Sequence, residues 1–236
     1  MMIIRQASKI LFDNGLKLFE GMNETSLLAE SGLIFLKRSL QIYPTKQCAQ
    51  ILITIFSNLL FDWSEVVYIQ QNVLPNIYGN ENYKFISENL YNGINAHKNV
   101  DFGQAINYYD KILFEVDSNC VEALFHKGVS YQHSGNIQVA ADMYYRAIQL
   151  CPIHTKAIIN MATLHQRFGR VVDSIPFYLK GIAIIEGFSV SFPEKHIMEK
   201  NEEYFMFYSN IALAYMQMGN MDKVGYFIVG GSLFSV

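Results

Sequence analysis

Runs of like charge are missing from this 236-residue chain, which has few charged residues of either sign. Charged residues make up 17% of the sequence, the formal net charge is -3, and Lys and Arg form no cluster. A nucleic-acid-binding surface needs such a cluster to neutralise phosphates, so we expect no nucleic-acid partner. Hydrophobic residues make up 51%, which excludes general disorder and predicts a chain that buries a core.

Cysteines and long apolar runs are also scarce. Cys48, Cys120 and Cys151 are the only three cysteines, and they are far apart with no CxxC pair. This excludes a disulfide framework and a zinc site, and it favours a reducing compartment. We expect a cytoplasmic location, with the nucleus as a further one. Residues 51–61 are too few to cross a bilayer, and residues 1–9 lack the apolar core of a secretory signal, so we expect no membrane partner.

Motifs for catalysis are absent as well. The sequence contains no GxGxxG, P-loop, HExxH or GxSxG pattern. Its six histidines lack the spacing of metal ligands on one helix. They are His97, His126, His133, His154, His165 and His196. We therefore predict no catalytic residue, metal or cofactor, and no enzymatic activity of the chain itself.

An internal repeat of about 34 residues is the main feature that the sequence does contain. The clearest unit covers residues 121–154 and follows the tetratricopeptide (TPR) pattern W-x2-L-G-x2-Y…A-x3-F…P. Leu124 takes the place of the usual Trp, and Lys127 that of the usual Leu. The remaining matches are Gly128, Tyr131, Gly135, Ala140, Tyr144, Ala147 and Pro152. This pattern predicts a pair of antiparallel helices.

The small residues of this unit have physical roles. Gly128 and Ala140 are expected where the two helices cross, because larger side chains would separate the backbones. Gly135 is suited to the left-handed conformation that ends a helix. Pro152 ends the second helix, since it lacks an N–H group and disfavours helical geometry in the residue before it.

Weaker copies of the repeat flank the clear one at residues 86–119, 155–188 and 205–236. The last copy is partial, because glycines after residue 224 interrupt its second helix, and we expect a frayed C-terminus. Residues 189–204 form an insertion. Further packing residues predicted in these copies are Gly93, Ala105, Ala162, Tyr178, Ala212 and Tyr215.

The first 84 residues have helical periodicity but match the repeat poorly, so we interpret residues 1–84 as diverged helical hairpins that cap the array. Together the segments predict an all-α fold. We expect a TPR helical-hairpin solenoid wound as a right-handed superhelix.

The segment 117–182 resembles the TPR region of SPINDLY-type and O-linked N-acetylglucosamine transferase-type glycosyltransferases. The similar stretches are residues 117–123 (DSNCVEA), 147–150 (AIQL) with Pro152, and 164–165 followed by Gly169-Arg170. With residues 95–109, the resemblance covers about half of the chain. It implies a superhelix that selects protein substrates for a nucleotide-sugar transferase domain. No transferase residue can be carried over, because that domain is not in the sequence.

Polypeptide binding in a concave groove is the function that a TPR array predicts. Some TPR proteins capture chaperone tails with a clamp of polar side chains. Its sequence pattern resembles Lys-x3-Asn on the first helix of one repeat and Lys-x3-Arg on that of another. The matching pairs here are Leu90/Ile94, Phe125/Val129 and Ile159/Thr163, which gives an apolar groove floor. Chaperone-tail capture of that kind is therefore disfavoured.

Asn160 and Asn210 occupy the same place in their repeats, which is similar to the asparagine ladder of O-linked N-acetylglucosamine transferase. That resemblance implies contact with a peptide backbone, since a carboxamide both donates and accepts hydrogen bonds. Tyr91 and His126 take this place in the earlier repeats, and Phe125 is a further candidate groove residue. Alternatively, the two asparagines bond neighbouring helices or water.

Two functional hypotheses follow. The chain is an interaction scaffold with protein or peptide partners, or it is the substrate-recognition part of a SPINDLY-like O-fucosyl or O-GlcNAc transferase without its catalytic domain. The sequence predicts no oligomeric state.

Overall fold

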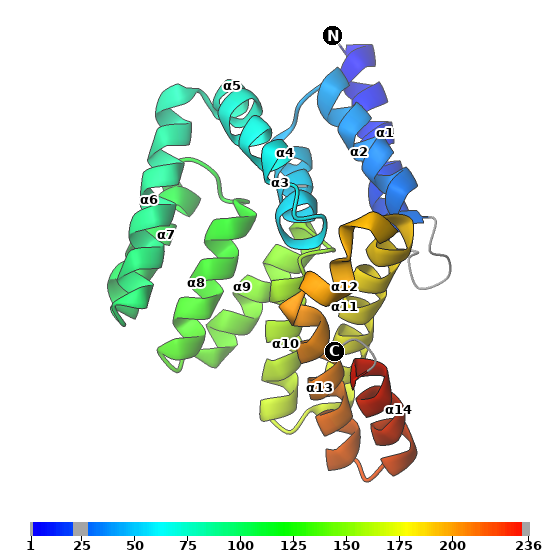
Figure 1. The fold of residues 1–236 in the computed structure, drawn as a ribbon. Helices are drawn as coiled ribbons and strands as arrows, with labels where there is room; N and C mark the ends of the chain where they lie inside the picture. Colours follow the sequence, from blue (N-terminus) through cyan, green and yellow to red (C-terminus); the bar gives the residue numbers. More distant parts are fainter. Residues whose placement is uncertain (1, 21–27, 233–236) are drawn as a thin grey trace.

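The computed structural model describes residues 2–20 and 28–232, and within these residues the protein is helical, with no strand (Figure 1). An N-terminal hairpin pairs α1 (Met2–Glu20) with α2 (Leu28–Ile42). A bent segment follows it. This segment consists of α3 (Lys46–Thr54), the π-helix η1 (Ile55–Leu59), α4 (Trp63–Tyr68), the π-helix η2 (Ile69–Val73) and α5 (Leu74–Tyr78).

Four helical hairpins then stack in chain order. They are α6 (Asn80–Lys98) with α7 (Phe102–Glu115), α8 (Val121–His133) with α9 (Ile137–Leu150), α10 (Thr155–Arg167) with α11 (Val171–Ser191), and α13 (Glu202–Gln217) with α14 (Met221–Ser232). Each hairpin packs on the next one, α7 on α8, α9 on α10 and α11 on α13. The predicted all-α hairpin solenoid is therefore confirmed for the described residues.

The turn between the two helices of each hairpin has the same backbone geometry. Gly135, Gly169 and Gly219 adopt φ values of 86°, 75° and 72° in this turn. Only glycine enters this left-handed region without a steric penalty. In the first hairpin Val100 takes the same place with a φ of 64°. The repeat thus recurs in the backbone even where its sequence does not.

The helices of a hairpin cross at positions without room for a larger side chain. A Cβ atom built on Gly128 would lie 2.8 Å from the ring of Tyr144, which is itself fully buried. Of the residues predicted to pack the repeats, Tyr131 is half-buried and the others are buried. The buried ones are Gly93, Ala105, Gly128, Ala140, Tyr144, Pro152, Ala162, Tyr178, Ala212 and Tyr215.

Three boundaries differ from the predicted ones. The first hairpin starts at Asn80 rather than at residue 86. The helix α11 continues to Ser191, into the predicted insertion at residues 189–204, so that only η3 (Pro193–Lys195) and α12 (Ile197–Lys200) separate it from α13. Instead of fraying, α14 remains helical to Ser232. Its Val224 and Phe227 are buried, and this tertiary packing outweighs the helix penalty of its glycines. Residues 233–236 lie outside the described part of the chain.

Residues 1–84 are not simply capping hairpins, because α3 and η1 lie along the loops that connect successive repeats. Gln47 donates to the carbonyl oxygen of Leu150 at 3.0 Å. Asn201, just before α13, donates to the carbonyl oxygen of Asn58 at 3.0 Å. The α1–α2 hairpin packs against α11, and the rings of Phe19 and Phe188 stack at 5.6 Å. The N-terminal residues therefore hold distant repeats together.

Most of the described helices are short compared with a bilayer span, which needs roughly 20 residues. None of them is by itself both long and apolar enough to cross a bilayer. α11 meets that criterion only in combination with the segment Pro193–Lys200, from which it is bent by 104°.

Candidate polypeptide-binding groove

Matching repeat positions lie on the first helices of the four hairpins, α6, α8, α10 and α13. Contacts join α6 to α8 and α10 to α13. The matching residues are Leu90, Phe125, Ile159 and Ser209, followed four positions later by Ile94, Val129, Thr163 and Leu213. We refer to the surface that these residues define as the groove face. Burial along it is uneven, and Phe125 and Ile159 have little exposed surface.

Contrary to the prediction, Phe125 does not line an open groove. Its side chain is 8% exposed, and its ring lies 4.8 Å from the ring of His154 and 6.0 Å from that of Tyr144. His154 belongs to the loop before α10. Phe125 therefore seals the junction of two repeats and presents little surface to a partner.

Asn160 and Asn210 occupy matching places on α10 and α13, and both are half-buried. The amide of Asn160 donates to the hydroxyl of Tyr144 at 3.2 Å, and Tyr144 donates to the side-chain oxygen of Gln132 at 2.8 Å. Asn160 therefore forms a hydrogen bond to the neighbouring helix α9. Such a bond was the alternative to contact with a peptide backbone. Its amide keeps one further donor and its acceptor oxygen.

Tyr91 and His126 differ in their access to solvent. Tyr91 on α6 is 68% exposed. The ring of His126 stacks on the buried Tyr109 at 5.9 Å, and its Nε2 lies 3.8 Å from a carboxylate oxygen of Glu122. Burial is the main cause that holds the pKa of His126 below its ordinary value, so the ring is neutral near pH 7. Of the two, Tyr91 is the more accessible to a ligand.

A stripe of exposed apolar side chains on α13 was missed by the sequence reasoning. Met206, Leu213 and Met216 are 50%, 46% and 49% exposed, and Ser209 lies between them on the same face. Their spacing of three, four and three residues places them along one side of a helix. The same spacing in the sequence could have revealed the stripe. Leu213 continues the row of Ile94, Val129 and Thr163 on the groove face.

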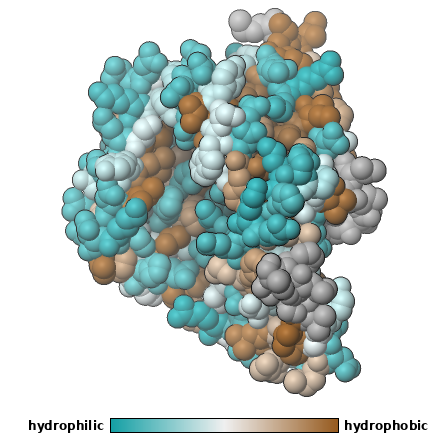
Figure 2. Space-filling view, in the orientation of Figure 1, coloured by the Kyte–Doolittle hydropathy of each residue, from teal (hydrophilic) through white to brown (hydrophobic). Residues whose placement is uncertain are grey.

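The solvent-facing surface around the first repeat is not uniformly polar. Figure 2 shows apolar side chains recessed between hydrophilic ridges where α6 lies opposite α3 and α5. A pocket of about 250 Å³ lies in this part of the molecule, with Leu90 of α6 and Leu74 of α5 among its lining residues. The groove face therefore has an apolar recess at its N-terminal end.

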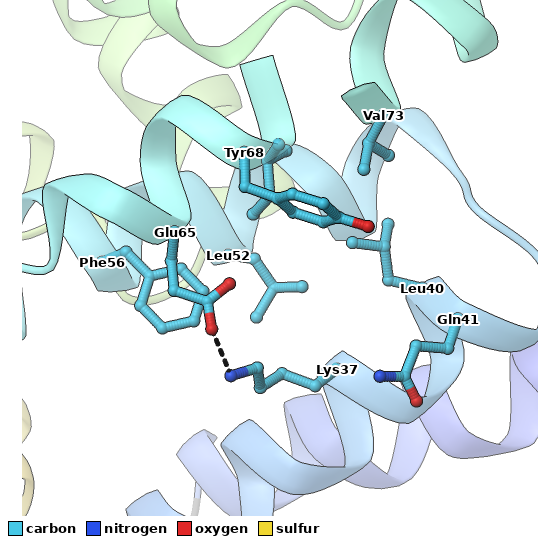
Figure 3. Close-up of a pocket in the computed structure, with 9 residues that line it drawn as sticks. Lys37, Leu40, Gln41, Leu52, Phe56, Glu65, Tyr68 and Val73 are labelled. Carbon is cyan, nitrogen blue, oxygen red and sulfur yellow. Dashed lines mark hydrogen bonds and ion pairs between the residues drawn. The ribbon is translucent and has the colours of Figure 1, made fainter. Parts of the chain in front are cut away.

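A second pocket of about 300 Å³ lies between α2 and the bent segment (Figure 3). Lys37 of α2 contacts Glu65 of α4 at 2.7 Å across it. Its apolar lining includes Phe56 from η1 and Ile69 and Val73 from η2, so both π-helices contribute to it. The ion pair in this pocket joins the N-terminal hairpin to the bent segment, and both of its charges are already paired.

Reactive groups are few among the described residues. No group of three or more His, Cys, Asp or Glu side chains is close enough there to hold a metal ion. Cys48, Cys120 and Cys151 are free and buried, and burial raises the pKa of each thiol to about 12. Such thiols stay protonated and are poor nucleophiles.

The helical hairpins and their repeated turns form a helical solenoid of the tetratricopeptide-repeat type. In agreement, the tetratricopeptide-repeat family model matches residues 121–154. Over 81 residues, or 34% of the chain, the sequence is 33% identical to a protein of Arabidopsis thaliana named "Probable UDP-N-acetylglucosamine--peptide N-acetylglucosaminyltransferase SPINDLY". The match spans 9% of that relative's length.

Solved structures of MamA are also similar. One of them has a TM-score of 0.49 and 15% sequence identity, over 87% of this chain and 88% of that chain. A second, of MamA AMB-1, has a TM-score of 0.38 and 14% identity, over 64% of this chain and 98% of that chain.

Proposed function

We propose that this protein is a non-catalytic interaction scaffold that binds polypeptide on its groove face. The supporting observation is the exposed stripe of Met206, Leu213 and Met216 on α13. Solvent exposure of several large apolar side chains in one row is typical of a surface that a partner covers. Methionine suits such a surface, because its flexible side chain adapts to different partners.

A second hypothesis, substrate recognition for a SPINDLY-like transferase, has weaker support. The similarity to SPINDLY covers 9% of that protein, and its activity does not transfer on that basis. A cytoplasmic or nuclear location remains part of our proposal, and it is supported by three cysteines that are all unpaired.

Affinity capture of the intact protein, with quantitative mass spectrometry, tests the scaffold proposal. The variant Leu213→Ser with Met216→Ser removes apolar surface from the groove face. The control, Tyr145→Ser with Val172→Ser, removes it from the second helices α9 and α11, where these residues are 53% and 64% exposed. We expect the first variant to lose partners by roughly tenfold, and the control to retain them. Equal recovery with both variants would show that partners bind elsewhere.

A further inference from the structure

The pocket of about 250 Å³ at the N-terminal end of the groove face is lined by the bent segment, α6 and the start of α8. Ile53 comes from α3, Leu74 from α5, Ile86 and Leu90 from α6, and Glu122 from α8. Its lining is mainly apolar, and a carboxylate stands at one side of it. Pockets that enclose small molecules measure roughly 300–1,000 Å³, so this one suits a single side chain better.

Hydrogen bonds fix the wall that the bent segment contributes. The Tyr78 hydroxyl donates to the buried carboxylate of Asp117, in the loop before α8. Gln50 donates to the Tyr78 hydroxyl at 3.0 Å, and its side-chain oxygen accepts from the backbone N–H of Val121 at 3.4 Å. The bent segment is thereby tied to the start of α8, and the pocket exists before any partner binds.

Glu122 has no permanently charged partner among the ion pairs of the described residues. Its carboxylate oxygens lie 3.8 Å from Nε2 of His126 and 4.0 Å from Nε2 of His154. Burial keeps both imidazoles neutral near pH 7, since it lowers their pKa. Lys156 contacts Glu203 instead, at 3.9 Å. Lys46 lies over the Tyr78 ring, 4.5 Å from its centroid, and does not line the pocket.

We propose that this pocket anchors a polypeptide partner through one apolar side chain, next to a Lys or Arg that pairs with Glu122. The inference rests on the proposed function and specifies the partner's chemistry. The apolar side chain would be buried against Ile53, Leu74 and Leu90, and the cation would supply the charge that Glu122 lacks. An acidic segment would be repelled by this carboxylate and by the net charge of -3.

Selection of a random twelve-residue peptide library displayed on phage, with the intact protein as bait, tests this inference. We expect the enriched peptides to share a large apolar residue adjacent to Lys or Arg. With Glu122→Lys as bait, the basic preference should change to an acidic one. Glu88→Lys is the matched control, because Glu88 is an exposed α6 residue outside the pocket lining, and it should leave the motif unchanged.

A second variant tests the apolar part. Ser87 is exposed and lines the pocket, so Ser87→Leu should fill its mouth without disturbing the core. Circular dichroism verifies the fold of each variant. For one enriched peptide, we expect affinity to fall about fivefold with Glu122→Gln and at least as much with Ser87→Leu.

The outcomes separate this inference from the proposed function. Peptides that are enriched without the apolar-basic motif, or with a motif that Glu122→Lys leaves unchanged, would overturn the pocket assignment and leave the scaffold proposal standing. No enrichment at all would count against both. Self-association of the protein that Glu122→Lys abolishes would mean that a second copy is the occupant, which also overturns the inference.

Discussion

At the scale of single residues, Val100 is the clearest source of strain. It has a φ of 64° in the turn where the later hairpins have glycine, and it is 70% exposed. A β-branched residue in this region is a steric outlier. We expect Val100→Gly to raise the free energy of unfolding by about 0.5–1 kcal/mol, because relief of strain exceeds the entropy that glycine loses on folding. Urea denaturation measures this. Gly135→Val should lower the free energy of unfolding. If both substitutions changed it in the same direction, Val100 would not be a source of strain.

His154 predicts a dependence of stability on pH. Its Nδ1 accepts a hydrogen bond from the backbone N–H of Ala157 at 3.1 Å and caps α10, which requires an unprotonated nitrogen. Burial, the largest cause, lowers its pKa from 6.5 to about 4. The folded state thus binds fewer protons than the unfolded state. The stabilisation is present above pH 6.5 and is lost as pH falls from 6.5 towards 4, by roughly 3 kcal/mol.

Urea unfolding at several pH values between 4 and 7 tests this prediction. His154→Asn retains a capping side chain and removes the titrating group, so the decrease in stability over this interval should become smaller. The exposed residue His196 provides the control, since His196→Asn removes a histidine at the surface. A pH dependence that is the same in both variants and in the wild type would exclude His154 as its source.

At the scale of the element, helix crossings and exposed positions within a helix place opposite demands on glycine. Gly128→Leu should lower the free energy of unfolding by about 1–3 kcal/mol or more, because its Cβ would already lie 2.8 Å from Tyr144. Gly225 lies within α14 with no neighbour within 4 Å of an added Cβ. Gly225→Leu should therefore raise stability by about 0.5–1 kcal/mol. Thermal unfolding of the two variants measures both changes. A change in stability of the same sign in both variants would contradict this prediction.

The sequence predicted the hairpins better than it predicted the surfaces between distant segments. Gly128, Tyr144 and Pro152 act within one repeat, and their spacing alone indicated the hairpin. The burial of Phe125 could not be predicted, because it depends on His154, which folds back from the start of α10 in the next hairpin. The course of residues 46–78 along the repeat loops was missed for the same reason. Its contacts, such as those of Gln47 and Asn201, are single hydrogen bonds over long sequence separations and leave no periodic pattern.

At the scale of the whole molecule, this chain departs from a simple solenoid, in which each repeat contacts only its neighbours. The N-terminal hairpin packs against α11, and the bent segment contacts the start of α8, the end of α9 and the residue just before α13. Contacts over such distances couple the stability of the repeats to that of the first helices. We therefore expect the described helices to unfold cooperatively rather than repeat by repeat.

Phe19 tests this coupling. It is 3% exposed on α1, and its ring stacks on Phe188 of α11 at 5.6 Å. Phe19→Ala should lower the free energy of unfolding by about 3–5 kcal/mol, through lost burial and the cavity that it leaves. Ile10→Ala, at a position of α1 that is 54% exposed, is the control and should change stability by about 0.5 kcal/mol or less.

Hydrogen exchange measured by mass spectrometry shows where the stability is lost. If the N-terminal hairpin supports the stack, Phe19→Ala should accelerate exchange in α11 and in the adjacent α13 as well as in α1 and α2. Acceleration confined to α1 and α2 would mean that the hairpin is an independent unit attached to a self-sufficient repeat array. The structure predicts the coupled result, because α11 packs against α10, α13 and the N-terminal hairpin. Phe19→Ala weakens the packing of α11 against this hairpin.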